Sequence, residues 1–258
     1  MTDHRKITEM IIPAKLKEIE EKEHVRIIHC VESGSRAWGF ASPDSDYDVR
    51  FIYVREKEHY LKLEKTRDVI EWQLDDTLDI NGWDLQKALR LLHNSNPTLF
   101  EWCNSPIVYK TTDEWMKVSE IITQYFLIKT GLHHYFNTAR TNFREYLRGD
   151  SVRLKKYFYV LRPILACRYI LDKQMPPPVL FKTLADVYLD DAIKPAMDEL
   201  IRKKMDTPEM GEGPRIQVIN DYLDASLHDI ENIIKALPRE RKAPWDELNQ
   251  LFIDMIQL

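Results

Sequence analysis

The sequence predicts an α+β protein, in which a small mixed β-sheet flanked by helices precedes an all-helical C-terminal domain. Short apolar runs separated by turn-forming residues occupy residues 25–81, as is typical of strands. From Asp113 onward, apolar residues recur at helical spacing, as is typical of helices that bury one face. We therefore divide the chain into a first domain of residues 1–112 and a helical domain of residues 113–258.

The first elements are an amphipathic helix and a buried strand. The helix is predicted over residues 7–22, and Pro13 is expected to kink it. Its rough apolar face consists of Ile7, Ile11, Leu16 and Ile19. The apolar run over residues 25–31 then predicts a strand that is buried on both faces.

A glycine-serine turn follows the first predicted strand. Gly34 and Ser35 interrupt the apolar run at a point where a short helix can begin. Small residues let backbone N–H groups approach a polyphosphate, and the start of a helix favours its negative charge. A plain helix cap at Ser35 is the simpler interpretation, and it is compatible with phosphate binding because both use the same N–H groups.

Two aspartates follow this turn at the spacing of neighbours on one strand face. Asp46 and Asp48 lie two residues apart, so in a strand both side chains project from the same side. Adjacent carboxylates repel each other unless a cation lies between them, and Mg²⁺ prefers oxygen ligands and leaves room for substrate phosphates. A solvated turn is the simpler interpretation of this acidic segment. Together with the glycine-serine turn, the pair favours a metal site.

A third carboxylate would complete such a site. Two runs at residues 67–74 and 77–81 predict a hairpin, and Asp79 projects from the polar face of its second arm. Asp84 is the competitor, but it opens an amphipathic helix, where capping and the helix dipole already explain an acidic residue. We choose Asp79, for which an exposed strand position is the simpler interpretation.

Two arginines lie beside these motifs. Arg36 and Arg50 could neutralise phosphate charge through their forked donors, or each could pair with a surface carboxylate instead. Arg50 lies two residues from Asp48 and so shares its strand face. We take both arginines as candidate nucleotide-binding residues.

The order of these motifs resembles the DNA polymerase β-like nucleotidyltransferase superfamily. Its pattern of Gly-Ser, a spacer, Asp-x-Asp and a later Asp between apolar residues matches Gly34-Ser35, Asp46-Tyr47-Asp48 and Leu78-Asp79-Ile80. Within the superfamily, the chain is most similar to a bacterial group of nucleotidyltransferases associated with RNA repair. The continuation of that group is similar to residues 83–90 and 96–102. The resemblance covers residues 25–105.

The resemblance implies a role for each motif. Asp46, Asp48 and Asp79 would be the metal-binding catalytic carboxylates, and Gly34 and Ser35 would hold the β- and γ-phosphates. The implied reaction is Mg²⁺-dependent, with Mn²⁺ as an alternative, and moves a nucleoside monophosphate from a triphosphate, expected to be ATP, to an acceptor hydroxyl. The acceptor stays open between an RNA end, a small molecule and a protein. The alternatives are a non-catalytic nucleotide-binding regulator and an antitoxin-like interaction protein.

Charge and histidine placement add two observations. The net charge of −5 argues against broad, nonspecific binding of a nucleic-acid duplex, although it does not exclude an RNA end. Basic residues recur at helical spacing at Arg140, Arg144 and Arg148, and Arg153, Lys155, Lys156 and Arg162 follow; they form either a solvated face or a second wall of a cleft. The adjacent His133-His134 point in different directions and do not form a metal-binding pair.

Cysteine usage and hydropathy predict a cytoplasmic protein without a membrane partner. Cys30, Cys103 and Cys167 lie in apolar contexts without metal-ligand spacing, so we expect reduced core residues. The segment 1–6 has no apolar signal core, and no run is long enough to cross a bilayer.

Overall fold

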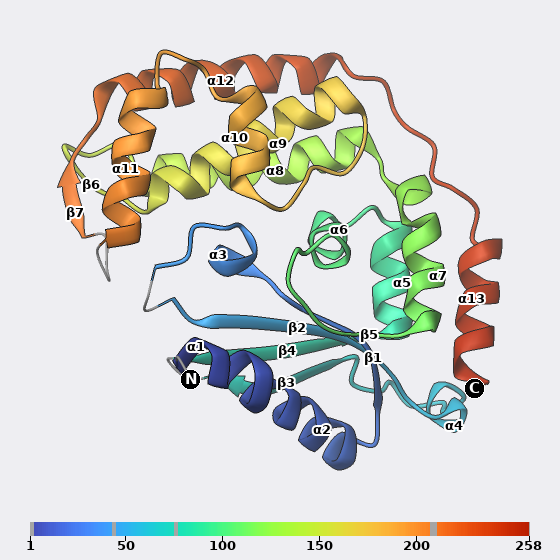
Figure 1. Ribbon diagram of the computed structural model, residues 1–258. Coiled ribbons are helices and arrows are strands. Elements are labelled where there is room, and N and C mark those ends of the chain that lie inside the picture. The colour runs from blue at the N-terminus through green and yellow to red at the C-terminus, as the bar shows by residue number, and fades with distance from the viewer. Residues whose placement is uncertain (1–2, 43–44, 75–76, 207–210, 258) are drawn as a thin grey trace.

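The computed structural model describes residues 3–42, 45–74, 77–206 and 211–257, and it confirms the predicted α+β class (Figure 1). A mixed sheet of strand order β3-β4-β2-β1-β5 lies beneath a layer of long helices. Only β2 and β4 pair in parallel; the other neighbours are antiparallel. The strands are β1 Arg26–Glu32, β2 Tyr47–Val54, β3 Val69–Leu74, β4 Leu78–Asp84 and β5 Val108–Thr111.

The sheet follows from the residue pattern of its strands. β1 is buried along nearly its whole length because it is a central strand with helices on both faces. β3 and β4 form the predicted hairpin. In β4, buried Leu78 and Ile80 alternate with half-buried Asp79, so Asp79 projects from the opposite face, as its position in the sequence predicted.

Two groups of helices cover the two faces of the sheet. One face packs against α1 Asp3–Lys6, the π-helical turn η1 Ile7–Ile11 and α2 Ile12–Glu23, so the predicted N-terminal helix is present. The π-helical turn ends directly before α2, whose first turn contains Pro13. The other face packs against α5 Leu85–His93, α6 Pro97–Cys103, α7 Asp113–Ile121 and α13 Asp246–Ile256. The last helix of the chain therefore returns to the core of the sheet.

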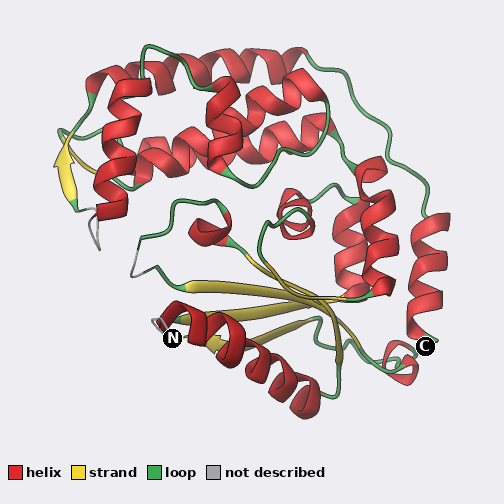
Figure 2. Ribbon diagram, viewed as in Figure 1, coloured by secondary structure: helices red, strands yellow, loops and turns green. Residues whose placement is uncertain are grey.

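The C-terminal region is helical, with one addition that the sequence did not predict. Its helices are α8 Ile128–Tyr146, α9 Lys156–Lys173, α10 Phe181–Tyr188, α11 Lys194–Asp206 and α12 Gln217–Ala236. A two-stranded ribbon of β6 Ser151–Arg153 and β7 Glu212–Pro214 departs from the all-helical prediction (Figure 2). Strands this short carry too few residues for an alternating pattern to be recognised. The boundary after residue 112 stays a prediction.

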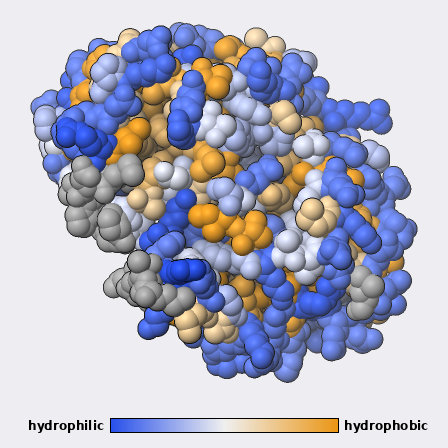
Figure 3. All heavy atoms as spheres, viewed as in Figure 1, coloured by the Kyte–Doolittle hydropathy of each residue, from blue (hydrophilic) through white to orange (hydrophobic). Residues whose placement is uncertain are grey.

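Three short helices complete the described chain: α3 Gly34–Ala37, α4 Lys57–Tyr60 and the 3₁₀-helix η2 Ile122–Tyr125. On the face shown in Figure 3, apolar residues gather at the centre, between the sheet and the helical layer, and hydrophilic residues surround them. None of the described helices is long and apolar enough to cross a membrane.

Asp84 has a structural role that separates it from Asp79. It caps α5, because its Oδ1 accepts a hydrogen bond from the Gln86 N–H at 2.8 Å and its Oδ2 accepts one from the Tyr60 hydroxyl at 2.9 Å. The side chain is buried, and burial raises the pKa of this carboxyl. The capping explanation inferred from the sequence is confirmed.

We expect Asp84→Ala to lower the free energy of unfolding by about 1–2 kcal/mol, because the cap is lost and the Tyr60 hydroxyl loses its partner. Urea denaturation measures the change. The exposed Asp113 at the start of α7 provides the control, and Asp113→Ala should cost clearly less. Equal losses in the two variants would contradict the capping role.

Candidate active site

The glycine-serine turn lies directly against one of the predicted catalytic aspartates. Gly34 has φ +59°, and a Cβ at this position would lie 1.9 Å from Oδ2 of Asp48. Only glycine satisfies both conditions, since other residues rarely adopt this backbone conformation and the space is already filled. The Ser33 N–H also donates to the Asp48 carbonyl at 2.8 Å. Ser33, rather than Ser35, is the N-cap residue of α3, so the simple cap proposed for Ser35 is wrong.

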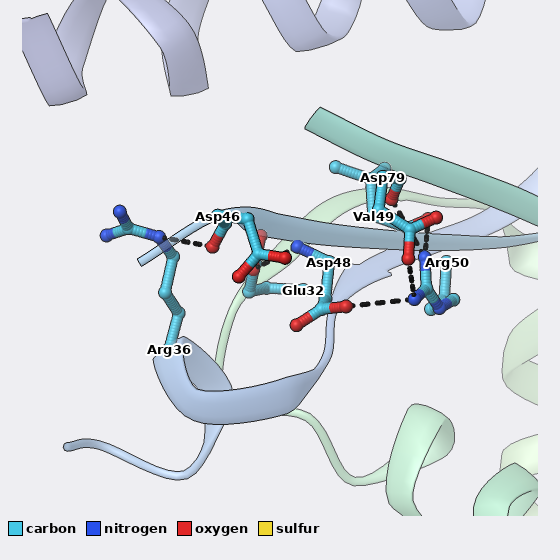
Figure 4. Close-up of polar contacts among 7 residues, drawn as sticks. All are labelled: Glu32, Arg36, Asp46, Asp48, Val49, Arg50 and Asp79. Atoms are coloured by element: carbon cyan, nitrogen blue, oxygen red, sulfur yellow. Dashed lines mark hydrogen bonds and ion pairs between the residues drawn. The ribbon is translucent and has the colours of Figure 1, made fainter. Parts of the chain in front are cut away.

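Asp48 and Asp79 lie side by side because β2 and β4 are parallel and pair these two residues in register. One nitrogen of Arg50, Nη2, donates to Asp48 Oδ1 at 2.9 Å and to Asp79 Oδ2 at 2.6 Å (Figure 4). The other terminal nitrogen, Nη1, donates to the Asp79 carbonyl at 2.8 Å. The two carboxylates therefore converge on one positively charged group, which offsets their mutual repulsion.

Asp46 lies outside the strand that carries Asp48. β2 begins at Tyr47, so Asp46 precedes the strand and its side chain is exposed. It is near enough to raise the pKa of Asp48, although burial is the larger cause of that rise and Arg50 opposes it. Within the described ranges, no three acidic, histidine or cysteine side chains converge as a ready metal site. The metal-binding role of the three aspartates stays a prediction.

Arg36 shapes the turn between α3 and β2. Its Nε donates to the Asp46 carbonyl at 2.9 Å (Figure 4). Its Nη2 donates to the Ser45 carbonyl. The guanidinium also stacks over the Tyr47 ring at 3.9 Å. In this structure Arg36 and Arg50 bind protein oxygens, and their predicted phosphate-binding role stays a prediction.

Glu32 is a site residue that the sequence motifs did not reveal. It ends β1 and is fully buried, and its carboxylate accepts hydrogen bonds from the Asp48 N–H at 2.8 Å and from the Tyr109 hydroxyl. Burial raises the pKa of Glu32 to about 7, and the nearby Asp48 charge acts in the same direction. Glu32 thus fixes the backbone at the residue whose side chain meets Arg50. An acidic residue at the end of an otherwise apolar strand was the available signal.

A cavity of about 260 Å³ opens beside Gly34 and Asp48. Its other walls come from α3, α6, α8 and α9, so the helical layer closes over the turn. Its lining includes Trp38, Glu101, His134, Tyr159 and Arg162. The ring of His134 borders the space, and burial lowers the pKa of this imidazole. The cavity combines aromatic faces with a few polar groups, as small-molecule sites commonly do.

Arg162 is a buried cation in this cavity. Its side chain is only 3 % exposed, and Nη1 donates to Glu101 Oε1 at 2.9 Å, an oxygen that also accepts from the Tyr135 hydroxyl at 2.9 Å. The guanidinium lies 4.6 Å from the Trp38 ring centre. Its Nη2 has no hydrogen-bond partner among the residues that the structure describes. A buried donor without a partner is costly, so this nitrogen is suited to a ligand acceptor.

The other members of the basic series do not reach this cavity. Arg140 and Arg144 are exposed on α8, Arg148 is exposed just after its end, and Arg144 makes a loose contact of 3.8 Å with Glu145. For these three arginines the solvated-face interpretation holds. Arg162 is the member of the series that forms part of a second wall.

The order of turn, aspartates and sheet defines a protein of the polymerase β-like nucleotidyltransferase class. The chain belongs to the RNA repair pathway DNA polymerase beta family, RlaP, which matches residues 9–254. This membership confirms the resemblance inferred from the sequence.

Two individual proteins are also similar. The uncharacterized protein YcgL of Bacillus subtilis (strain 168) is 44% identical over 247 residues, which cover 94% of each chain. The crystal structure of a nucleotidyltransferase-like protein from Exiguobacterium sibiricum 255-15 has 15% sequence identity and a TM-score of 0.31. That match covers 94% of this chain and 86% of the other.

We expect Gly34→Ala to destabilise the protein by about 1–2 kcal/mol through its left-handed backbone, and to displace the Asp48 carboxylate. Urea denaturation reports the first effect, and calorimetric titration with Mg²⁺ and a nucleoside triphosphate reports the second. Gly211 has open space around it, so Gly211→Ala is the matched control. Wild-type stability and triphosphate binding in Gly34→Ala would show that the close contact is unimportant.

Glu32 gives the folded protein a pH dependence of defined sign. In the folded protein the pKa of Glu32 is about 7, which lies above its ordinary value of 4.5. The stability that Glu32 contributes is therefore complete below pH 4.5 and is lost as the pH rises through about 7. Glu32→Gln removes this titration. Its free energy of unfolding should therefore rise relative to wild type across this interval, as measured by denaturation at several pH values. The control is Glu71→Gln, which changes an exposed glutamate. If the free energy of unfolding of Glu32→Gln differed from that of wild type by the same amount at every pH, the raised pKa of Glu32 would be refuted.

Proposed function

We propose that this protein is a Mg²⁺-dependent nucleotidyltransferase, with Mn²⁺ as an alternative metal. It transfers a nucleoside monophosphate from a triphosphate, expected to be ATP, to an acceptor hydroxyl and releases pyrophosphate. The observation that carries the proposal is the register of Asp48 and Asp79, whose carboxylates converge on a cation beside the Gly34 turn.

The acidic residues fit a divalent metal. Asp48 and Asp79 direct one oxygen each toward a single nitrogen of Arg50, which shows that their side chains accommodate a positive charge between them. Oxygen ligands on a hard cation are the donor set that Mg²⁺ prefers. Asp46, exposed just before β2, would join them. When bound, the metal would lower the pKa of the acceptor hydroxyl and neutralise charge on the triphosphate.

We assign the β- and γ-phosphates to Gly34 and Ser35. The missing side chain of Gly34 leaves backbone accessible beside Asp48, and N–H groups at the start of a helix turn have no partner within it. Arg36 supports this turn from behind through the carbonyls of Ser45 and Asp46. The chain thus supplies positioning and charge, which are the main requirements of this kind of transfer.

The cavity beside the turn suits the nucleoside. At about 260 Å³ it is smaller than the roughly 300–1,000 Å³ of sites that enclose whole ligands, so the phosphates would lie outside it, toward Asp48. Trp38 and Tyr159 offer aromatic faces to a base. The Nη2 of Arg162, which has no partner in the described part of the chain, and the carboxylate of Glu101 offer one donor and one acceptor to its edge.

An RNA end is our proposed acceptor, and a cytoplasmic location is proposed with it. The description of the family as part of an RNA repair pathway supports RNA over a small molecule or a protein. One observation favours a nucleotide-binding regulator without turnover: Arg50 already pairs with both carboxylates. Triphosphate binding without pyrophosphate release would support that regulator.

We expect Asp48→Asn and Asp79→Asn each to abolish acceptor-dependent pyrophosphate release while the protein stays folded, because each removes charge from the point where the carboxylates converge. Release is measured with each of the four ribonucleoside triphosphates, with Mg²⁺ or Mn²⁺ and with cellular RNA. Glu71→Gln, on the exposed side of β3, removes the same charge and should leave release intact. Full activity in either aspartate variant would reject the assignment.

A further inference from the structure

A second cavity, of about 880 Å³, lies where α8 begins. Its walls are the first turns of α8 and the segment 239–242, which belongs to the connection between α12 and α13 (Figure 1). It is lined by the carboxylate of Glu240, by His133 and by four cations, which are Lys129, Arg239, Arg241 and Lys242. This positive cavity belongs to a chain whose net charge is −5.

The cations of this cavity lack acidic partners. The ammonium groups of Lys129 and Lys242 donate to neutral oxygens, those of the Leu237 carbonyl and the Asn94 side chain. Among the described residues, Arg239 and Arg241 form no ion pair, as the salt bridges of the structure lie elsewhere. Their charge is therefore available to an external anion.

The connecting segment is held in place at several points. Both oxygens of Glu240 accept hydrogen bonds from the first N–H groups of α8, those of Ile128 at 2.8 Å and Lys129 at 2.6 Å. Further along, His93 donates to the Ala243 carbonyl at 3.0 Å and stacks on Trp245 with ring centres 3.5 Å apart. Arg239 and Arg241 flank Glu240, so their backbone is held in place, while both side chains are exposed. Binding an anion would order these two side chains but not the segment that carries them, which lowers the entropic cost.

One stripe of α8 connects this cavity with the cavity beside Asp48. Thr130 lines the cationic cavity, while His134 and Thr138 line the other. These residues are four apart and share one helix face, and the stripe extends about 12 Å along the helix axis. His133 and His134 point into the two different cavities. A flexible chain of a few monomers bound in the cationic cavity could therefore reach the edge of the other cavity, which the proposed function assigns to the nucleoside of the triphosphate.

We propose that the cationic cavity binds the phosphates of a single-stranded polynucleotide whose terminal hydroxyl reaches the edge of the cavity beside Asp48. This inference rests on the proposed function, because it assigns a binding site to the acceptor of that reaction. Guanidinium groups match phosphate oxygens with paired donors, and an electropositive groove that follows the backbone is the usual means of binding single strands. The ligand must supply anions to the cationic cavity and a hydroxyl near Asp48. A polynucleotide does both, since it carries regularly spaced anions and ends in a hydroxyl. An acidic peptide would satisfy the cations but does not in general present that hydroxyl at its end.

The test measures binding separately from chemistry. A fluorescent single-stranded RNA of about 16 nucleotides is titrated with the full-length Asp48→Asn protein, so that no transfer occurs, and anisotropy gives the affinity at several salt concentrations. We expect Arg239→Gln/Arg241→Gln to weaken binding roughly tenfold or more. The slope of log affinity against log salt should fall by about 1.4, or about 0.7 per lost cation.

The matched control removes the same charge from α8, away from both cavities. Arg140 and Arg144 are exposed and line neither cavity, so Arg140→Gln/Arg144→Gln should change affinity and slope much less. Equal losses in the two double variants would overturn the proposal, as would an absence of RNA binding. Equally tight binding of polyglutamate or of anionic lipid vesicles would also overturn it, by showing a site for anions in general.

The results separate this inference from the proposed function. RNA binding that depends on Arg239 and Arg241, in a protein that releases no pyrophosphate, would support RNA binding by the cationic cavity and reject the proposed transferase activity. Pyrophosphate release that depends on a protein acceptor, without RNA binding, would support the transferase and reject the cavity.

Discussion

Two carboxylates held side by side require a cation, and much of the sheet-containing half of this protein serves that arrangement. Asp48 and Asp79 meet because β2 and β4 are the one parallel pair in the described sheet, and the register of this pair places the two residues opposite each other. Neither carboxylate can turn away freely, since each is about three-quarters buried. Arg50, from the same strand as Asp48, supplies the positive charge at the point where they converge. The arrangement of the two carboxylates alone thus favours a positive charge between them.

The elements around Asp48 restrict it from three directions. Glu32 binds its N–H, Ser33 binds its carbonyl, and Gly34 leaves its carboxylate just enough room. All three are consecutive residues at the junction of β1 and α3. This junction leads directly into the turn assigned to phosphates. A change at this junction would therefore affect the proposed metal ligands and the proposed phosphate turn together.

The buried ion pair between Arg162 and Glu101 joins the two halves of the molecule. Arg162 comes from α9 of the helical layer, and Glu101 comes from α6, which packs on the sheet. Pairs of this kind add little net stability after desolvation, but breaking one is costly because it leaves a buried charge. We interpret this pair as fixing the position of α9 over the turn, so that Tyr159 and Trp38 face the same space. The pair thereby sets the shape of the cavity.

Local patterns predicted much of the fold and of the catalytic strands, because alternation and turn chemistry act between near neighbours. Asp79 could be chosen over Asp84 for that reason: strand alternation placed the first on a polar face, and helix capping explained the second. Asp46 was assigned to a strand that in fact begins one residue later, an error within the usual uncertainty of element ends. Glu101 and Arg162 could not be paired from the sequence, since 61 residues separate them and only tertiary packing brings them together.

The distribution of charge explains how an acidic protein could bind an anionic substrate selectively. Acidic residues surround the point where Asp48 and Asp79 converge, so phosphates are repelled there unless a cation accompanies them. Four cations that form no ion pair among the described residues instead lie together at the cavity where α8 begins. Long-range attraction is weak because the net charge is negative, and screening at physiological salt confines each field to about 8 Å. An anionic strand would therefore be bound only where it contacts the cationic cavity directly, which favours strand ends that can also reach the aspartates over duplexes bound along their length.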